Sequence, residues 1–173
     1  MSNGKLIKIA EIDCNGVNTA TLTGITTEHD VYICTWNNVK TSTDDKDIVF
    51  KFTKSGTADS TANYDYKFQF HRTDTDFTGV YGSDATSVTI TASAGNDSGF
   101  SSNGIMHLFN LPTTQYSYAT VQNVYMNIST VLMGYHGSLT HTVASASDGI
   151  KFTAESSANW ASGNFKLYAL KNS

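Results

Sequence analysis

The segment YDYKFQFH at positions 64–71 decides the fold class. Aromatic residues occupy every second position in it, and polar or charged residues fill the positions between them. A period of two places successive side chains on opposite faces of a strand, whereas a helical face recurs about every 3.6 residues. The segment therefore predicts a β-strand whose aromatic face is directed toward a core.

The same alternation recurs along the chain, most clearly in Asp47–Thr53 and Ser87–Ala92. Polar segments rich in Ser, Gly, Asn, Asp and Thr separate the strands and predict turns and loops at Lys54–Asn63, Gly79–Thr86 and Ser93–Gly104. Many short strands divided by polar turns indicate a β-sandwich or a closed barrel. The other predicted strands are Leu6–Ile12, Ala20–Ile25, Val31–Trp36, Ile105–Leu111, Tyr118–Ile128, Val131–Tyr135, His141–Ala144, Ile150–Ala154 and Asn164–Leu170.

Val31–Trp36 differs from the other predicted strands because it is apolar on both faces. We expect it to lie centrally in a sheet or to have one face covered by a neighbouring chain. No internal repeat and no linker divides the 173 residues, so the sequence predicts one domain spanning positions 1–173. A chain of this length buries enough surface to fold without a metal or disulfide.

The charge pattern excludes several partners. The formal net charge is −4, only 15% of the residues are charged, and Arg72 is the only arginine. Nucleic-acid binding is not expected, because neutralising phosphates requires a local basic patch. The apolar segment Leu6–Ile9 is too short for a signal peptide or a membrane span, so we expect a chain that stays in the cytoplasm until assembly. We expect Cys14 and Cys34 to be buried free thiols.

Two short motifs resemble parts of catalytic or metal sites. Gly95–Gly99 (GNDSG) is faintly similar to the nucleophile segment of chymotrypsin-like proteases, but these are also common turn residues, and nothing around His29 or His71 matches that family's histidine segment. Asp74–Gly79 begins like an EF-hand loop, although Ala85 occupies the position of the expected glutamate.

A loop cation held by Asp74, Asp76 and Asp84 stays an open alternative to a solvated turn. The two cysteines lack a Cys-x-x-Cys spacing, and the chain has no P-loop or dinucleotide fingerprint. We therefore expect no enzyme, no metal and no cofactor.

Exposed aromatic rings could bind sugars, since flat rings stack on pyranose faces while Asn and Asp bind the hydroxyls. The candidates are Trp36, Trp160, Tyr81 and Tyr116. The alternative, which we favour, is that most of them are core or subunit-contact residues, because Tyr and Trp are enriched in both settings.

The most specific signal lies at the C-terminus, in GIKFTA (149–154) followed by NWASGNFKLYALK (159–171). These segments resemble the ending of a family of tailed-phage virion proteins, which close with a strand, a short loop containing "ASG" and a last strand of the form F-x-L-Y-G-hydrophobic-K. The segments TLTGI (21–25) and DVYI (30–33) are similar to that family's first two strands. In this ending we expect Gly163 to make a tight turn.

The final strand is expected to direct Phe165 and Leu167 inward and Tyr168 and Lys171 outward. Ala169 stands where the family usually has glycine. The resemblance implies an all-β, jelly-roll-like antiparallel β-sandwich that forms a homotrimer in a virion.

Our hypothesis from the sequence is a non-enzymatic bacteriophage structural protein, a capsid decoration (cement) protein that binds the major capsid protein or other virion proteins. The alternative is a tail-fibre or receptor-binding module that recognises host surface glycans. Low charge with abundant Ser and Thr suits permanent contact surfaces, which are depleted in Lys and Glu. The side chains expected to face partners are Trp36, Tyr116, Tyr118, Trp160 and Tyr168.

Overall fold

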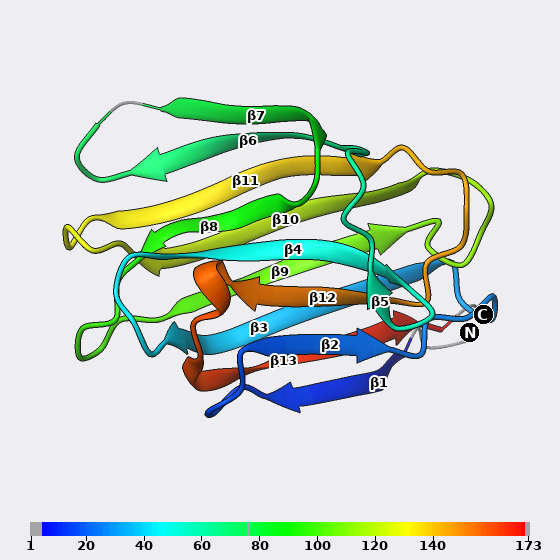
Figure 1. Cartoon of the computed structure of the whole chain (residues 1–173), viewed down its shortest axis with the longest axis horizontal. Coiled ribbons are helices and arrows are strands. Elements are labelled where there is room, and N and C mark those ends of the chain that lie inside the picture. The colour runs from blue at the N-terminus through cyan, green and yellow to red at the C-terminus, as the bar shows by residue number, and fades with distance from the viewer. Residues whose placement is uncertain (1–4, 76, 172–173) are drawn as a thin grey trace.

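The structure, a computed structural model, describes residues 5–75 and 77–171, and it is a sandwich of two antiparallel β-sheets (Figure 1). The larger sheet has eight strands. Their spatial order is β1 (Leu6–Asp13), β13 (Trp160–Leu170), β3 (Val31–Thr41), β9 (Ser102–Phe109), β10 (Ser117–Met126), β11 (Leu132–His141), β6 (Tyr64–Arg72) and β7 (Thr78–Ala85).

The smaller sheet packs over only part of the larger one. Its order is β2 (Thr19–Thr23), β12 (Gly149–Ala154) and β4 (Lys46–Lys54), and β4 also pairs with β8 (Val88–Ala94) and with the two-residue β5 (Thr57–Ala58). A short 3-10 turn, Glu155–Ser157, joins β12 to β13. The strands β6 and β7 lie beyond β8 (Figure 1), so the larger sheet extends past the edge of the smaller one.

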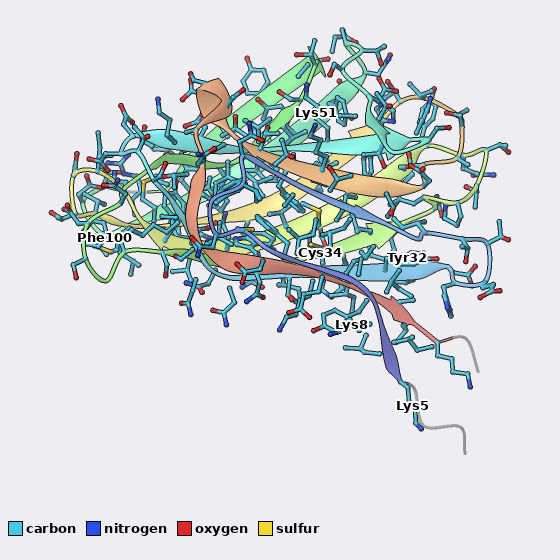
Figure 2. All side chains as sticks on the ribbon, turned by 60° about the horizontal axis from the view of Figure 1, so that its bottom comes forward. Lys5, Lys8, Tyr32, Cys34, Lys51 and Phe100 are labelled. Carbon is cyan, nitrogen blue, oxygen red and sulfur yellow. The ribbon has the colours of Figure 1, made fainter. Side chains whose placement is uncertain are left out.

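The core lies between the sheets and is built from the inward rows of both. The period of two predicted for Tyr64–His71 is observed in β6, where Tyr64 and Phe68 are fully buried. Phe50 and Phe52 of β4 enter the same core from the other sheet, and the rings of Phe152 and Phe165 stack with centroids 4.3 Å apart. Figure 2 shows Cys34 between the layers, Lys51 on the outer side of the smaller sheet and Lys8 on the outer side of the larger one.

The predicted fold class is confirmed, and β3 lies inside the larger sheet, between β13 and β9, as its two apolar faces indicated. Three local predictions are wrong. The segment Gly79–Thr86 was expected to be a loop, but most of it forms the edge strand β7. Val131–Tyr135 and His141–Ala144 were expected as two strands, but a single strand, β11, covers the region up to His141.

The third wrong prediction concerns Gly163, which makes no tight turn. It lies within β13 at a register shift opposite β3, with a φ of +98°. A Cβ at this position would come 2.5 Å from the backbone nitrogen and Cα of Val39. Glycine is required here because two strands approach closely at a β-bulge. The inward direction of Phe165 and Leu167 and the outward direction of Tyr168 agree with the expectation.

Candidate binding surfaces

The outer face of the smaller sheet is polar. Thr21 of β2, Lys151 of β12 and Lys51 of β4 lie side by side across three strands. The neighbouring row contains Val49, Thr153 and Thr19, which also face outward. Threonine suits the exposed face of a strand because its branched side chain packs on the pleat while its hydroxyl stays hydrated. Threonine and lysine therefore dominate this face.

The outer face of the larger sheet is different, because apolar side chains gather on four neighbouring strands. Tyr168 pairs with Ile33, Val31 pairs with Phe109, and Phe109 in turn pairs with Tyr118. We call this set, completed by Ile105, the docking patch. Tyr118 is 45% exposed and the other five side chains are half-buried, so the patch presents apolar side chains to solvent, with His107 lying between Ile105 and Phe109.

Charged side chains border the docking patch at the β1 edge. Lys8 and Lys166 both bind Glu11, with nitrogen–oxygen distances of 2.7 and 3.3 Å. These ion pairs are solvent-exposed and add little stability. An apolar centre with a charged rim is the usual anatomy of a protein–protein contact surface.

Of the five side chains predicted to face partners, the three tyrosines lie at the surface and the two tryptophans lie in the core. Tyr118 and Tyr168 both belong to the docking patch, on β10 and β13. Tyr116 is 44% exposed in the loop that precedes β10. Ile33, Ile105 and Phe109 were not among the predicted residues. The double apolar face of Val31–Trp36 could have indicated Ile33 and its neighbour Val31, but not Ile105 or Phe109.

The prediction for Trp36 and Trp160 is wrong, because both side chains belong to the core. Trp36 is 2% exposed, and its indole N–H donates to Ser102 Oγ at 3.0 Å. Trp160 is 1% exposed and packs edge-to-face on Phe165, with ring centroids 5.7 Å apart. Neither ring can reach a sugar or a protein partner. Among the sugar candidates, Tyr81 stays available at 72% exposure, on the outer side of the sheet, with the Lys67 Nζ 4.9 Å above its ring.

A second feature lies where the larger sheet extends past β8. Here a cleft of about 340 Å³ opens between the inner face of the β6–β7 pair and the edge of the smaller sheet, and we call it the hairpin cleft. Its apolar wall contains Tyr66, Phe70 and Tyr135, and the rings of Phe70 and Tyr135 stack with centroids 4.4 Å apart. Tyr66 and Phe70 are only half-buried because no strand of the smaller sheet covers them.

The opposite wall of the hairpin cleft is polar. Asp47 lies there with Thr89 and Ser93, and Arg72 and Asn127 complete the lining. One carboxylate oxygen of Asp47 accepts the Ser93 backbone N–H at 2.9 Å. Burial is the largest influence on the Asp47 carboxyl and raises its pKa above the ordinary value. Aromatic rings on one wall and hydrogen-bonding groups on the other make this cleft suited to a small ligand that has both apolar and hydroxylated faces.

Within the described residues, neither of the two short motifs from the sequence is joined by further catalytic or metal-binding side chains. Arg72 binds both carboxylate oxygens of Asp74, at 2.8 and 2.7 Å, while Asp76 lies outside the described residues and Asp84 belongs to β7. Among residues 5–75 and 77–171, no group of three His, Cys, Asp or Glu side chains could hold a metal ion. Ser98 lies in the loop between β8 and β9, whereas His29 contacts the Tyr32 ring.

The prediction for the cysteines is confirmed. Cys14 and Cys34 are both free and both buried. Burial raises the pKa of the Cys14 thiol to about 12 and raises that of Cys34 as well, so both stay protonated at neutral pH. Neither thiol is a nucleophile in this fold.

Comparisons with protein families, with curated proteins and with solved structures found no match for this chain. In the described part of the chain, no helix is long and apolar enough to cross a membrane. The docking patch and the hairpin cleft are therefore the features of the molecule that point to a function.

Proposed function

We propose that the chain is a non-catalytic structural protein of a tailed-phage virion, a capsid decoration protein that acts as a homotrimer. The observation that carries the proposal is the docking patch, an apolar surface on a sheet face that the fold itself leaves uncovered. Contiguous exposed apolar surface on a folded domain usually marks a contact with another protein. The resemblance of the last two strands to virion proteins supports the same class of function.

We assign the docking patch to contacts between copies of this chain. Its composition supports this choice, because aromatic and branched aliphatic side chains make up the patch while Lys8 and Lys166 at its border are paired with Glu11. Interfaces between identical subunits are more apolar than transient ones and are depleted in lysine and glutamate at their centres. A trimer formed in this way presents three copies of its other surfaces to the capsid.

The mechanism is mechanical. Each protomer binds weakly to a shell, and linked protomers bind with a much higher effective concentration, so the trimer binds an assembled capsid far more tightly than a single chain does. Binding only to the assembled state stabilises that state by mass action. No reacting group is needed for this activity.

The test has two parts, on the purified chain and on empty capsids of the phage that encodes it. Light scattering after size-exclusion chromatography is expected to give a trimer, and co-sedimentation is expected to give a fixed ratio of chain to capsid protein. Ile33→Lys places a charge at the centre of the docking patch and is expected to yield monomers that keep the wild-type circular-dichroism spectrum. Thr21→Lys, on the outer face of the smaller sheet, is the matched control and is expected to stay trimeric.

Each alternative outcome is informative. A monomeric wild-type chain would refute the assignment of the docking patch to self-association. A trimer that ignores capsids but adsorbs to host cells and blocks infection would replace the decoration function with receptor binding.

A further inference from the structure

We propose that the hairpin cleft binds a single pyranose residue of an uncharged glycan. This inference is independent of the proposed capsid role, because the cleft and the docking patch lie on opposite faces of the larger sheet. It depends only on the side chains that line the cleft.

The aromatic wall is held in place before any ligand binds. Tyr66 lies against Gly82 on the neighbouring strand, where any Cβ would collide with the phenol ring. The Tyr66 ring also stacks on Phe68, with centroids 5.5 Å apart and planes 29° apart. A fixed, half-exposed ring offers a platform to the flat C–H face of a pyranose at little cost in side-chain entropy.

The polar wall supplies what sugar hydroxyls need. Asp47 is an acceptor: the Ser93 backbone N–H and the Thr89 hydroxyl bond to its carboxylate, which keeps lone pairs for a ligand. Thr89 and Ser93 line the same wall, and Arg72 is oriented by its two bonds to Asp74. Tyr66 also lines the cleft, and a phenol hydroxyl can both donate and accept a hydrogen bond. Donors and acceptors thus surround the aromatic platform.

Other ligand classes fit the cleft less well. A purely apolar molecule would displace water from the Asp47 carboxyl and offer no hydrogen bond in its place, which is costly. A phosphate or another strong anion would meet Asp47, while the one guanidinium in the lining is already paired with Asp74. A neutral sugar can stack on the aromatic wall and hydrogen-bond to the polar wall. The cleft volume of about 340 Å³ is near the lower end of the usual range for small-molecule sites.

The experiment is a titration of the isotopically labelled chain with the methyl glycosides of glucose, galactose, mannose, rhamnose and N-acetylglucosamine, followed by NMR. At least one probe is expected to shift the resonances of Tyr66, Phe70 and Ser93 in a saturable way. Tyr66→Leu removes the platform and is expected to weaken that probe's affinity about tenfold, the equivalent of roughly 1.4 kcal/mol. Tyr66→Phe keeps the ring and is expected to lose less.

The matched control is Tyr81→Leu, which alters an exposed tyrosine on the same strand pair but on the opposite face of the sheet. It is expected to bind the probe like the wild type. Asp47→Asn provides a second variant in case Tyr66→Leu unfolds, and it is also expected to weaken binding. The proposal is wrong if none of the five glycosides shifts the cleft resonances, or if Tyr66→Leu and Tyr81→Leu bind equally well. A failure here would leave the capsid and trimer results unaffected.

Discussion

The two outer faces of the sandwich have the same pleated geometry but opposite chemistry. Threonine and lysine cover the smaller sheet, as at Thr21 and Lys151, whereas aromatic and aliphatic side chains gather on the larger sheet, as at Ile33 and Phe109. Folding requires only that one face of each sheet be apolar. The second face is therefore free to follow function, and the difference between the two faces locates the surface that contacts other molecules.

The sharpest division within the larger sheet is between its inward and outward aromatic side chains. Trp36→Ala removes a fully buried indole and its hydrogen bond to Ser102, so we expect a loss of about 3–5 kcal/mol in the free energy of unfolding. Tyr118→Ala, on the docking patch, is expected to change the stability of the protomer by less than about 0.5 kcal/mol. Urea denaturation followed by tryptophan fluorescence measures both.

Similar losses for the two variants would contradict this division between core and surface. Because Trp160 remains in the Trp36→Ala variant, the fluorescence signal survives the substitution. The urea titration should be run at a protein concentration low enough to keep Tyr118→Ala and the wild type in the same oligomeric state, since self-association adds to apparent stability.

Most inward rows could be predicted from sequence because alternation is a local pattern. The strand β6 follows it directly, while β7 was missed because TGVYGSDA contains two glycines and few apolar residues. The strand β11 was divided in two because Gly134 and Gly137 interrupt its pattern. Gly137 is needed there, since a Cβ would collide with the Lys67 carbonyl oxygen and the Phe68 ring. Such close contacts involve distant residues and leave no local signal.

The binding surfaces were harder to predict for a related reason. Where both faces of a strand are apolar, as in Val31–Trp36, alternation does not tell which row faces the core, and Trp36 was assigned to a partner. The hairpin cleft exists because the smaller sheet ends at β8 while the larger continues to β7. Relative sheet width is a property of the whole topology, so Tyr66 and Phe70 could not be distinguished in sequence from the buried Tyr64 and Phe68.

The comparison of inward and outward rows can be sharpened within the single strand β11, which carries His141 on its inner face and His136 on its outer face. His141 is fully buried and packs on Tyr64 and Phe52, with ring centroids 4.6 and 5.7 Å away. Burial lowers its pKa below the ordinary 6.5, although the nearby Asp59 carboxylate, 3.4 Å from Nε2, acts in the opposite direction.

The folded state therefore binds the His141 proton less readily than the unfolded state does. The contribution of His141 to stability is complete above about pH 6.5 and is lost as the pH falls below that value, with a slope of at most about 1.4 kcal/mol per pH unit. The positive charge of Lys54 also lowers the pKa of His141. The expected measurement is a fall in the free energy of unfolding between pH 6.5 and 5.

Two variants test this assignment. His141→Phe should flatten the stability profile between pH 6.5 and 5, because it removes the group that titrates. His136→Gln, on the outer face of the same strand, should leave the profile as it is. Asp59 has a lowered pKa, so its own effect appears only at more acidic pH and does not overlap this range. Equal profiles for His141→Phe and the wild type would show that another group controls the acid response.

The smallest expected effect concerns the polar outer face of the smaller sheet. Lys151 lies directly opposite Lys51, whose Nζ donates to Ser60 Oγ at 2.7 Å. Like charges opposite each other in a sheet are destabilising, so Lys151→Glu is expected to stabilise the protein by about 0.2–1 kcal/mol at low ionic strength. The gain should shrink in 1 M salt, where the screening length falls to about 3 Å.

Lys151→Thr is the matched control, because it removes the repulsion without adding an attraction and should give a smaller gain. Thermal unfolding of the three proteins at two salt concentrations measures the difference. If Lys151→Glu instead destabilises the protein at low salt, contacts of the two lysine side chains must stabilise the fold by more than their repulsion costs. The side chains on the outer face of the smaller sheet would then make specific stabilising contacts. The difference between that face and the docking patch could no longer be used to identify the docking patch as the functional surface.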